Sequence, residues 1–461
     1  MEENPKVYYR SARSSSLQTS LVSSVLTLFD AAGFDRMIKP HDVVAIKLHC
    51  GEWNNTAYLR PVYARALADR VKELGGRPFV CDTITLPYGP YASRATALDL
   101  LITAERNGYN SATLGCPFIA ADGSSGMDDV RVELPEGYIL KEAFIAHAIA
   151  NADVLIVLSH FKGHATGMIG GAIKNLGIGA QSQRGKRNVH MARHPKYGIQ
   201  ATTDFHPERC LGRRGCPAWE TCANGCPEGA IEVTEDSVIW HRDRCNMSAT
   251  HYGTSTWCGV FDFPKGLWEA SNVAMADACL ATVKTVGRDK VGFINLAIDI
   301  APGCDCADHS DVPVVPNLGV LASADPVALD AACLDLITAA PGMPGSAAEE
   351  MGVMEAGVKK METVSGTLQQ VNEDLQINTG VAIGLGRRDY ELIVVEPLAD
   401  AAPFRFGPDK RPIGLRIRAK TRGERNTFPW GRFDGKGFDR KDEVDFAPLR
   451  GASAAETAKA E

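Results

Sequence analysis

Long apolar runs are missing from this sequence of 461 residues. The longest of them, such as ADVLIVL at residues 152–158, are too short to span a bilayer. The formal net charge is −7, and there is no basic stripe interleaved with aromatic residues, which argues against a nucleic-acid partner. The N-terminal stretch MEENPKVYYRSARSSS lacks the basic-then-apolar order of a secretory signal. We therefore expect a cytoplasmic protein without a membrane span.

A disulfide framework is equally unexpected, although the sequence contains 13 cysteines. Their number is odd, they are unevenly spread, and no export signal accompanies them. This combination favours metal binding or redox chemistry. Six of the cysteines lie between residues 210 and 258, and Cys304 and Cys306 form a second, tighter pair.

The first half of the sequence alternates between strand-like and helix-like segments. Residues 42–50 and 77–83 are short apolar runs that end in polar residues, whereas 60–76 has helical spacing and ends at a pair of glycines. Residues 141–152 are predicted to form a further helix before a buried strand. This alternation predicts an α/β fold, in which a mainly parallel sheet is covered by helices on both faces.

The alternation is interrupted once, and we predict four segments from the changes in composition. An α/β domain occupies residues 1–200 and resumes at 263–396. Between its halves, residues 201–262 are rich in cysteine and glycine and form a small insert. From 397 to 461 the sequence is charged and poor in aliphatic residues, so this extension should be separable from folding.

The ends of the predicted strands carry the candidate catalytic residues. Parallel sheets bind ligands beyond the carboxyl ends of their strands, so these side chains should converge. Histidine and lysine at such positions can bind substrate or move protons. The candidates are His49, His160, Lys162, His164 and Asp305. The simpler alternative for the two histidines of SHFKGH is an ordinary loop between glycines.

The stretch CDCADHSD, residues 304–311, is the candidate metal site. Its proposed ligands are Cys304, Cys306 and His309, joined by histidines from the other half of the chain. The alternative is a polar turn with two buried thiols. A glycine-rich segment at residues 169–187, IGGAIKNLGIGAQSQRGKR, does not match a phosphate loop, because its spacing before Lys186 is one residue too long. It remains a candidate loop for another anion, with Lys174 or Lys186 as the cation.

The insert contains the pattern C-x5-C-x5-C-x3-C-P, formed by Cys210, Cys216, Cys222 and Cys226. Thiolates suit both iron–sulfur clusters and zinc. The closing CPEGAI favours iron, because a ferredoxin-type motif ends in this way. Zinc is the alternative, although zinc sites usually have shorter spacings within each cysteine pair. Cysteines that bind nothing are the third interpretation.

Several stretches, taken together and in this order, resemble one known family, the uncharacterised iron–sulfur proteins built on domain of unknown function 362. The stretches are VAIKLHCGEWNNTAYLRP, VKELGGRPFVCDT, IAADG, LSHFKGHATGMIGGAIKNLGIG, CPEGAI, CDCADHSDVPVVPNLGVLASADPVALDAACLDL and GLGRRDYELI. The resemblance implies a lactate-racemase-like α/β fold with a ferredoxin-like insert that carries two C-x2-C-x2-C-x3-C-P runs. Here the first run is stretched, and the second retains only Cys245 and Cys258.

These departures predict one 4Fe-4S cluster. In two-cluster ferredoxins, three cysteines of one run bind together with the last cysteine of the other. The ligands are then Cys210, Cys216, Cys222 and Cys258. Cys226 and Cys245 are left two thiolates short of a second cluster. The rival assignment replaces Cys258 with Cys226.

The sequence thus predicts an iron–sulfur oxidoreductase. A small electron carrier such as ferredoxin or flavodoxin would supply electrons, and the cluster would pass them to a substrate or metal site at the strand ends. A second metal ion, an unknown small-molecule substrate and a homodimer are compatible with this interpretation. One alternative is a non-redox metal-dependent enzyme on a lactate-racemase-like fold, with a structural cluster. Another is a protein that delivers a metal or a cluster.

Overall fold

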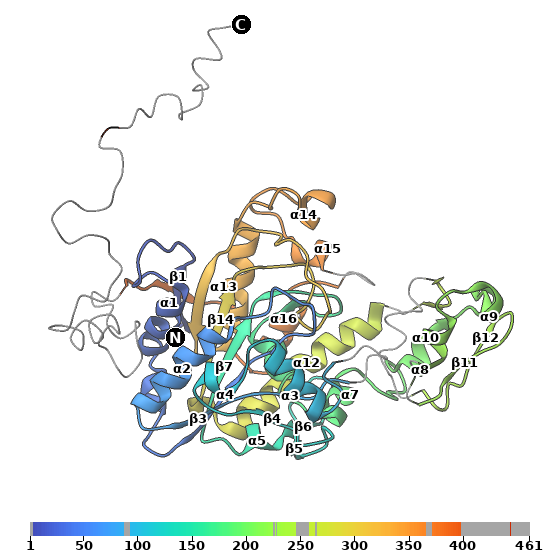
Figure 1. Ribbon diagram of the computed structural model, residues 1–461, viewed down its shortest axis with the longest axis horizontal. Helices are drawn as coiled ribbons and strands as arrows, with labels where there is room; N and C mark the ends of the chain where they lie inside the picture. Colours follow the sequence, from blue (N-terminus) through green and yellow to red (C-terminus); the bar gives the residue numbers. More distant parts are fainter. Residues whose placement is uncertain are drawn as a thin grey trace, which may run out of the picture. The chain divides into compact units, whose positions relative to one another are not determined.

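The computed structural model describes residues 3–86, 93–224, 226, 228–245, 258–262, 265–365, 371–397 and 443. Its centre is an eight-stranded sheet with the strand order β16-β1-β15-β14-β7-β2-β3-β4 (Figure 1). The strands of this sheet are β1 (Lys6–Ser11), β2 (Val43–Lys47), β3 (Arg77–Asp82), β4 (Phe118–Ala120), β7 (Val154–His160), β14 (Val291–Ala297), β15 (Gly319–Ser323) and β16 (Glu391–Val394).

Most neighbouring strands in the sheet are parallel. The run β14-β7-β2-β3-β4 is parallel throughout, and so is the pair formed by β1 and β16. Only β15 runs antiparallel to both of its neighbours. The predicted α/β class with a mainly parallel sheet is therefore confirmed. The parallel run places the carboxyl ends of β14, β7, β2 and β3 side by side at one edge.

Helices cover both faces of the sheet, because alternate residues of its central strands are apolar on both sides. In β2, Val44 and Ile46 belong to one core and Ala45 to the other. Figure 1 shows the blue helices on one side of the strands and the yellow helix α12 on the other. The first core contains α1 (Leu21–Ala31), α2 (Pro61–Glu73) and α3 (Ala97–Arg106), and the second contains α6 (Ala172–Gly177), α12 (Lys265–Val286), α13 (Pro326–Ala339) and α16 (Leu375–Ala382).

Short helices connect these larger elements. Several of them begin at a side chain that caps the first backbone N–H groups, as Asn110 does for α4 and Ser182 for α7. The short α-helices are α4 (Ser111–Leu114), α5 (His147–Ala150), α7 (Gln183–Val189), α8 (Ile199–Thr202), α9 (Gly212–Gly215), α10 (Trp219–Asn224), α14 (Ala347–Glu350) and α15 (Met361–Val364). Short 3-10 helices occupy Phe34–Met37, Pro207–Arg209 and Arg288–Lys290.

The helix predicted for residues 141–152 is wrong. Residues Glu142–Ala146 form strand β6, which pairs with β5 (Asp129–Glu133), and only the four-residue α5 follows. Burial alternates along the first four residues of EAFIA, because Ala143 and Ile145 are buried in the core while Phe144 is only half-buried. Pairing with β5 therefore overrides the weak helical spacing of the longer segment.

Three further strand pairs lie outside the large sheet. Strands β8 (Lys162–His164) and β9 (Met168–Gly170) form a hairpin directly after β7. In the cysteine-rich segment, β10 (Asp204–Phe205) pairs with β13 (Phe261–Asp262). Between them, β11 (Ile231–Val233) and β12 (Val238–Trp240) form a hairpin that follows Cys226. The β10–β13 pair brings the two ends of this segment together.

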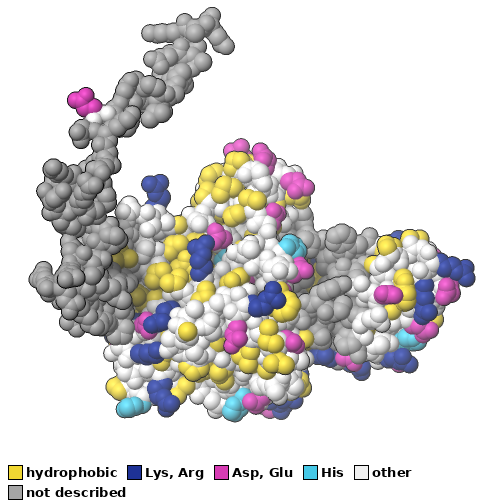
Figure 2. Space-filling view, in the orientation of Figure 1, with side chains coloured by type: hydrophobic (Ala, Val, Ile, Leu, Met, Phe, Trp, Pro, Cys, Tyr) yellow, Lys and Arg dark blue, Asp and Glu magenta, His cyan; other side chains and the backbone are white. Residues whose placement is uncertain are grey.

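The described surface carries charges of both signs. On the face shown in Figure 2, acidic and basic side chains are interspersed among hydrophobic ones. Within the described part of the chain, no helix combines the length and the apolar character that crossing a membrane requires. The elements above all belong to the unit Met1–Pro408. The predicted extension 397–461 lies outside the described residues except for positions 397 and 443.

Candidate metal centre

Loops that follow three adjacent strands meet at the carboxyl edge of the sheet. The N–H of Glu52, after β2, donates to the carbonyl oxygen of Asp305, after β14, at 2.8 Å. After β7, the N–H of Gly163 donates to the carbonyl oxygen of Ala301 at 2.9 Å. The strand order β14-β7-β2 makes these contacts possible, because the three loops leave the same edge. The segments KLHCGE, SHFKGH and CDCADH therefore surround one region.

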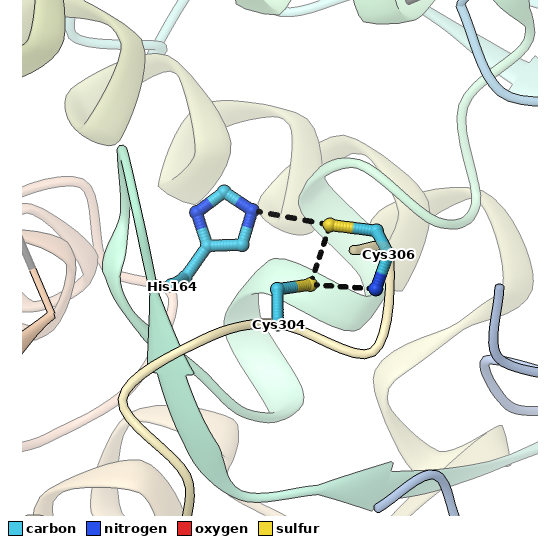
Figure 3. A group of neighbouring side chains, drawn as sticks. All are labelled: His164, Cys304 and Cys306. Atoms are coloured by element: carbon cyan, nitrogen blue, oxygen red, sulfur yellow. Dashed lines mark hydrogen bonds between the residues drawn. The ribbon is translucent and has the colours of Figure 1, made fainter. Parts of the chain in front are cut away.

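The centre of this region is the dithiol formed by Cys304 and Cys306. Their Sγ atoms are 2.7 Å apart, and both thiols are free (Figure 3). The Cys304 sulfur accepts three hydrogen bonds, from the Cys306 thiol, from the Cys306 N–H at 3.3 Å and from Lys174 Nζ at 3.5 Å. Cys304 is buried and Cys306 is half-buried. Three donors around one sulfur favour the thiolate form of Cys304.

The surroundings of the two thiols shift their pKa values in opposite directions. Burial opposes ionisation of Cys304, but the hydrogen bond from Cys306 and the charges of Lys162 and Lys174 outweigh it and lower the pKa of this thiol well below its ordinary value. The same hydrogen bond, together with burial, raises the pKa of Cys306. Burial would lower the pKa of Lys174, yet the two cysteine sulfurs raise it overall. Cys304 is thus the more readily ionised of the two thiols, and the ammonium group of Lys174 lies beside it.

His164 is the third member of the group. It ends strand β8, and its Nε2 lies 3.9 Å from the sulfur of Cys306 (Figure 3). Its Nδ1 accepts the N–H groups of Gly167 at 2.9 Å and Thr166 at 3.2 Å. Burial and the charge of Lys174 lower the pKa of His164 to about 4. The ring is therefore neutral near pH 7, with its proton on Nε2, facing the sulfur.

These three side chains can hold a metal ion. The ligand atoms of His164, Cys304 and Cys306 all lie within 4.8 Å of one another, and no other such trio occurs in the described part of the chain. Two thiolates and an imidazole suit zinc, iron, nickel or copper. The dithiol is preformed, because the two sulfurs are already in contact. Binding through Nε2 of His164 requires the ring proton to move to Nδ1 and the bond from Gly167 to break.

His160 and Asp305 form a buried pair beside the dithiol. The Nδ1 of His160 lies 2.9 Å and 3.1 Å from the two carboxylate oxygens of Asp305. The Nε2 of His160 donates to the carbonyl oxygen of Ile298 at 2.7 Å. Both ring nitrogens of His160 thus face protein oxygens, so this side chain holds the loop that follows β14. Lys162 approaches the same carboxylate of Asp305, at 3.9 Å.

The remaining predicted catalytic residue, His49, also lies at this edge. Its Nδ1 accepts the N–H of Gly51 at 2.9 Å, and the ring is half-buried. Burial and the nearby charge of Arg94 lower the pKa of His49 to about 3, so the ring is neutral near pH 7. Its proton consequently sits on Nε2, as in His164.

His309 stands apart from the group that was predicted to include it. Its side chain is 80% exposed and interacts with the adjacent Asp308. Its carbonyl oxygen, rather than its ring, is tied to the site, because it accepts a hydrogen bond from the Asn55 side chain at 2.8 Å. His164, rather than His309, joins the two cysteines in the group that could hold a metal ion. Strand β8 carries His164 and directs its ring at the sulfur of Cys306.

Two buried ion pairs at the site are absent from the sequence-based list. Lys47 Nζ lies 3.0 Å from Asp82, and Arg94 Nε lies 3.0 Å from Glu52. A charged residue at the end of an apolar strand, as at Lys47 and Asp82, is a signal that the sequence does contain. Arg94 gives no such signal, because it follows no strand and its partner lies 42 positions away.

The two lysines of the glycine-rich segment have different surroundings. Lys174 contacts the dithiol, as described above. Lys186 Nζ donates to Thr83 Oγ1 at 2.7 Å and to the Gln181 carbonyl oxygen at 2.6 Å. Burial lowers the pKa of Lys186 to about 8, although Asp122, at 4.0 Å, opposes this effect. Lys186 is thus held by protein oxygens, and Lys174 is the cation that faces the candidate metal centre.

The insert's cysteines differ among themselves in exposure. Two sulfurs accept backbone N–H groups, Cys210 from Gly212 at 3.4 Å and Cys226 from Ala230 at 3.3 Å. Cys226 and Cys245 are buried in a third core that also contains Trp268 of α12. Cys210, Cys216 and Cys222 are half-buried, and Cys258 is exposed. Which of them bind a cofactor stays a prediction.

One family model matches more than half of the chain. The chain belongs to the family described as "Domain of unknown function (DUF362)", whose model matches residues 44–335. A search of curated proteins finds no match.

Two solved structures are similar to part of the chain. The lactate racemase apoprotein from Thermoanaerobacterium thermosaccharolyticum shares 12% sequence identity, with a TM-score of 0.32 and coverage of 64% of this chain. A protein from Thermotoga maritima shares 8% identity, with a TM-score of 0.31 and coverage of 62%. The matches cover 51% and 52% of those two chains, so this chain spans about half of their length.

Proposed function

We propose that the protein is a metal-dependent oxidoreductase whose metal ion is bound by Cys304 and Cys306, with His164 as a third ligand, and whose insert carries one 4Fe-4S cluster. The observation that supports the metal centre best is the buried dithiol itself. Its two sulfurs are in contact, and a buried ammonium group, that of Lys174, lies beside them. Burial also argues against a delivery protein at this site, since a cargo must be reached by its acceptor.

The residues around the dithiol have separate tasks in this proposal. Lys174 offsets the negative charge of the thiolates. His160 and Asp305 hold the loop between the two cysteines. His49 is a neutral imidazole that presents an Nε2–H to the region, so it can donate a proton to a bound substrate or accept one after it has been lost.

The insert offers six thiols for a cluster, and we retain Cys210, Cys216, Cys222 and Cys258 as its ligands, with Cys226 as the rival to Cys258. A 4Fe-4S cluster supplies one-electron transfer when bound. The hydrogen bond from the Gly212 N–H to the sulfur of Cys210 supports this role, because hydrogen bonds to the cysteine sulfurs tune the reduction potential of a cluster. A small carrier such as ferredoxin or flavodoxin would be the electron source.

Metal analysis of anaerobically purified protein tests the sheet-edge centre. Cys304→Ala and Cys306→Ala should each remove one equivalent of bound metal. His164→Ala should weaken the affinity for the metal by at least roughly 10- to 100-fold, the loss seen when a residue that only supports a ligand is removed. Cys279→Ala is the matched control, because Cys279 is also buried but belongs to the core under α12. Wild-type metal content in both dithiol variants would refute the proposed centre.

Iron counting tests the ligands of the insert. Cys258→Ala should lose the cluster, whereas Cys245→Ala should leave the iron content near that of the wild type. Retention of about four irons in the Cys258→Ala protein would transfer the fourth position to Cys226. About eight irons in the wild-type protein would contradict the single cluster.

A further inference from the structure

The carboxylates around the dithiol have their hydrogen-bonding capacity engaged. Asp305 faces His160, and both oxygens of Asp82 are bonded, one by Lys47 Nζ at 3.0 Å and the other by the N–H of Cys50 at 3.2 Å. Glu52 accepts Arg94 Nε on one oxygen and the N–H of Ser93 at 3.2 Å on the other. The acidic groups of this region therefore have little capacity left for a cationic ligand.

The cations have capacity left. Among the described residues, the two Nη groups of Arg94 donate no hydrogen bond, since its Nε–Glu52 contact is its only side-chain bond there. Lys162 Nζ likewise donates none there, and its nearest carboxylate oxygen, on Asp305, is 3.9 Å away. Both residues are more than nine-tenths buried, Arg94 at 3% exposure and Lys162 at 4%. Buried charged donors without an acceptor are costly, and native proteins keep them chiefly for function.

Both cations flank the residue that separates the two cysteines. Lys162 approaches the Asp305 side chain, and Arg94 is held by Glu52, whose backbone N–H bonds to the Asp305 carbonyl oxygen. The charge of Lys162 acts on the Cys304 thiol and that of Arg94 on the Cys306 thiol, which agrees with this placement. The free donors thus lie at the loop that carries the dithiol.

We propose that Arg94 and Lys162 form the binding site for the carboxylate, or similar oxoanion group, of a small substrate whose other end reaches the dithiol centre. The proposal names the substrate class for the function proposed above and rests on it. A guanidinium presents a planar pair of N–H donors that matches a carboxylate, and a lysine adds a point charge from another direction. The neutral Nε2–H group of His49 would then face the part of the substrate near the sulfurs.

Gly170 provides space for this arrangement. A Cβ atom at this position would lie 2.8 Å from Lys162 Nζ and 3.4 Å from Lys174 Cδ. Gly170→Ala therefore moves the ammonium group of Lys162 without removing its charge. The backbone at Gly170 does not have a positive φ, so alanine adds no backbone strain.

Alkylation of the dithiol tests the proposal with a probe of the expected class. Iodoacetate carries a carboxylate, and iodoacetamide has the same size but is neutral. Each reacts when a thiolate displaces iodide. Full-length protein, freed of site metal with a chelator under anaerobic conditions, is treated with each reagent at pH 7.5. The rate at the Cys304–Cys306 peptide is read by mass spectrometry. The iodoacetate-to-iodoacetamide rate ratio should exceed that of glutathione by about tenfold.

Variants assign that preference to the two cations. Arg94→Gln, Lys162→Gln and Gly170→Ala should each lower the ratio several-fold. Arg94→Gln leaves Glu52 unpaired, so the double variant Glu52→Gln with Arg94→Gln is measured as well, because it removes both partners of the buried ion pair. Arg65→Gln, which removes a surface arginine paired with Asp69, should leave the ratio unchanged.

Competition identifies the oxoanion. Added acetate and inorganic phosphate should both slow alkylation by iodoacetate. The anion that slows it more identifies the preferred class of oxoanion. A wild-type ratio equal to that of glutathione, or a ratio unchanged in all four site variants, would overturn the anion site. The result is separate from the metal proposal: a preference for iodoacetate in a protein that never binds metal would keep the anion site and reject the metal centre.

Discussion

The sheet-edge site and the cysteine-rich insert place their thiols in different ways. At the sheet edge, Cys304 and Cys306 are in contact, and their neighbours come from three adjacent strands and their loops. In the insert, the cysteines range from buried Cys226 to exposed Cys258, and residues 246–257 between Cys245 and Cys258 lie outside the described residues. The difference shows that a strand order can preform a site from residues that are distant in the sequence.

Removing one thiol from each region should give the largest effect and separate the two sites. Cys216 belongs to both assignments of the cluster ligands, so Cys216→Ala should lose nearly all insert iron while the sheet-edge metal stays. Cys304→Ala should show the reverse. Iron, sulfide and total metal are measured on anaerobic preparations.

If either substitution removes both cofactors, the two regions form one metal-binding unit and the comparison fails. The far-ultraviolet circular dichroism of both variants serves as the control for folding. Cys279→Ala again supplies the buried-thiol reference.

Much of the sheet-edge site follows from sequence periodicity. Apolar runs that end in histidine, lysine or aspartate predict strands whose polar ends share an edge, and the structure brings His49, His160 and Asp305 to that edge. Arg94 could not be found in this way, because its role depends on a loop that folds back to Glu52. His164 was found, but its contact with Cys306 required knowledge of the hairpin formed by β8 and β9.

The close contact between the β8 hairpin and the loop after β14 should be sensitive to one methyl group. A Cβ at Gly163 would overlap the carbonyl oxygen of Pro302, a backbone atom that cannot move alone. Gly163→Ala should therefore cost about 1–3 kcal/mol of unfolding free energy and weaken the sheet-edge metal, without loss of insert iron. Urea unfolding measures the first effect and metal analysis the second.

Gly266→Ala is the matched control, since nothing lies within 4 Å of its added Cβ and it sits in helix α12. This variant should be neutral or slightly more stable. Equal unfolding free energies for the Gly163→Ala and Gly266→Ala proteins would contradict a tight contact between the hairpin and the loop after β14.

The free energy of unfolding should depend on pH through Asp330, a buried residue that supports the site from the core. Burial raises its pKa to about 6, although the N–H groups of Ala172 and Ile173 and the Asn295 side chain bond to it. Because the folded pKa exceeds the unfolded one, folding favours the protonated acid. Its contribution is full below about pH 4 and is lost as the pH rises through 6.

Asp330→Asn tests this contribution. The wild-type protein should lose about 1 kcal/mol from this group between pH 5 and pH 7, and the variant should lack that loss. Urea unfolding at the two pH values gives the difference. A variant whose pH dependence equals that of the wild type would contradict the role of Asp330.

The smallest effect is expected from the C-terminal extension. Its charged, aliphatic-poor composition can bury little, so truncation after residue 397 should preserve solubility, insert iron and sheet-edge metal. Strand β16 ends at Val394 and stays intact in this variant. Aggregation or loss of iron on truncation would place the extension in the core or in a subunit contact.

The misread segment 141–152 shows where sequence periodicity fails in this fold. Its alanines permit a helix or a strand, and the choice is made by β5, which pairs along the full length of β6. Local propensity cannot include such a partner. The long apolar strands β7 and β14 have no such ambiguity, because they are buried on both faces.

X-ray absorption spectroscopy of the metal bound at the sheet edge tests the central claim most directly. The Cys216→Ala protein is the suitable sample, because it should lack the insert cluster and its sulfur signal. The account predicts two sulfur scatterers at about 2.3 Å and a nitrogen scatterer at about 2.0–2.1 Å, for a metal bound by Cys304, Cys306 and His164. A first shell of nitrogen and oxygen alone, without sulfur, would contradict the dithiol metal centre.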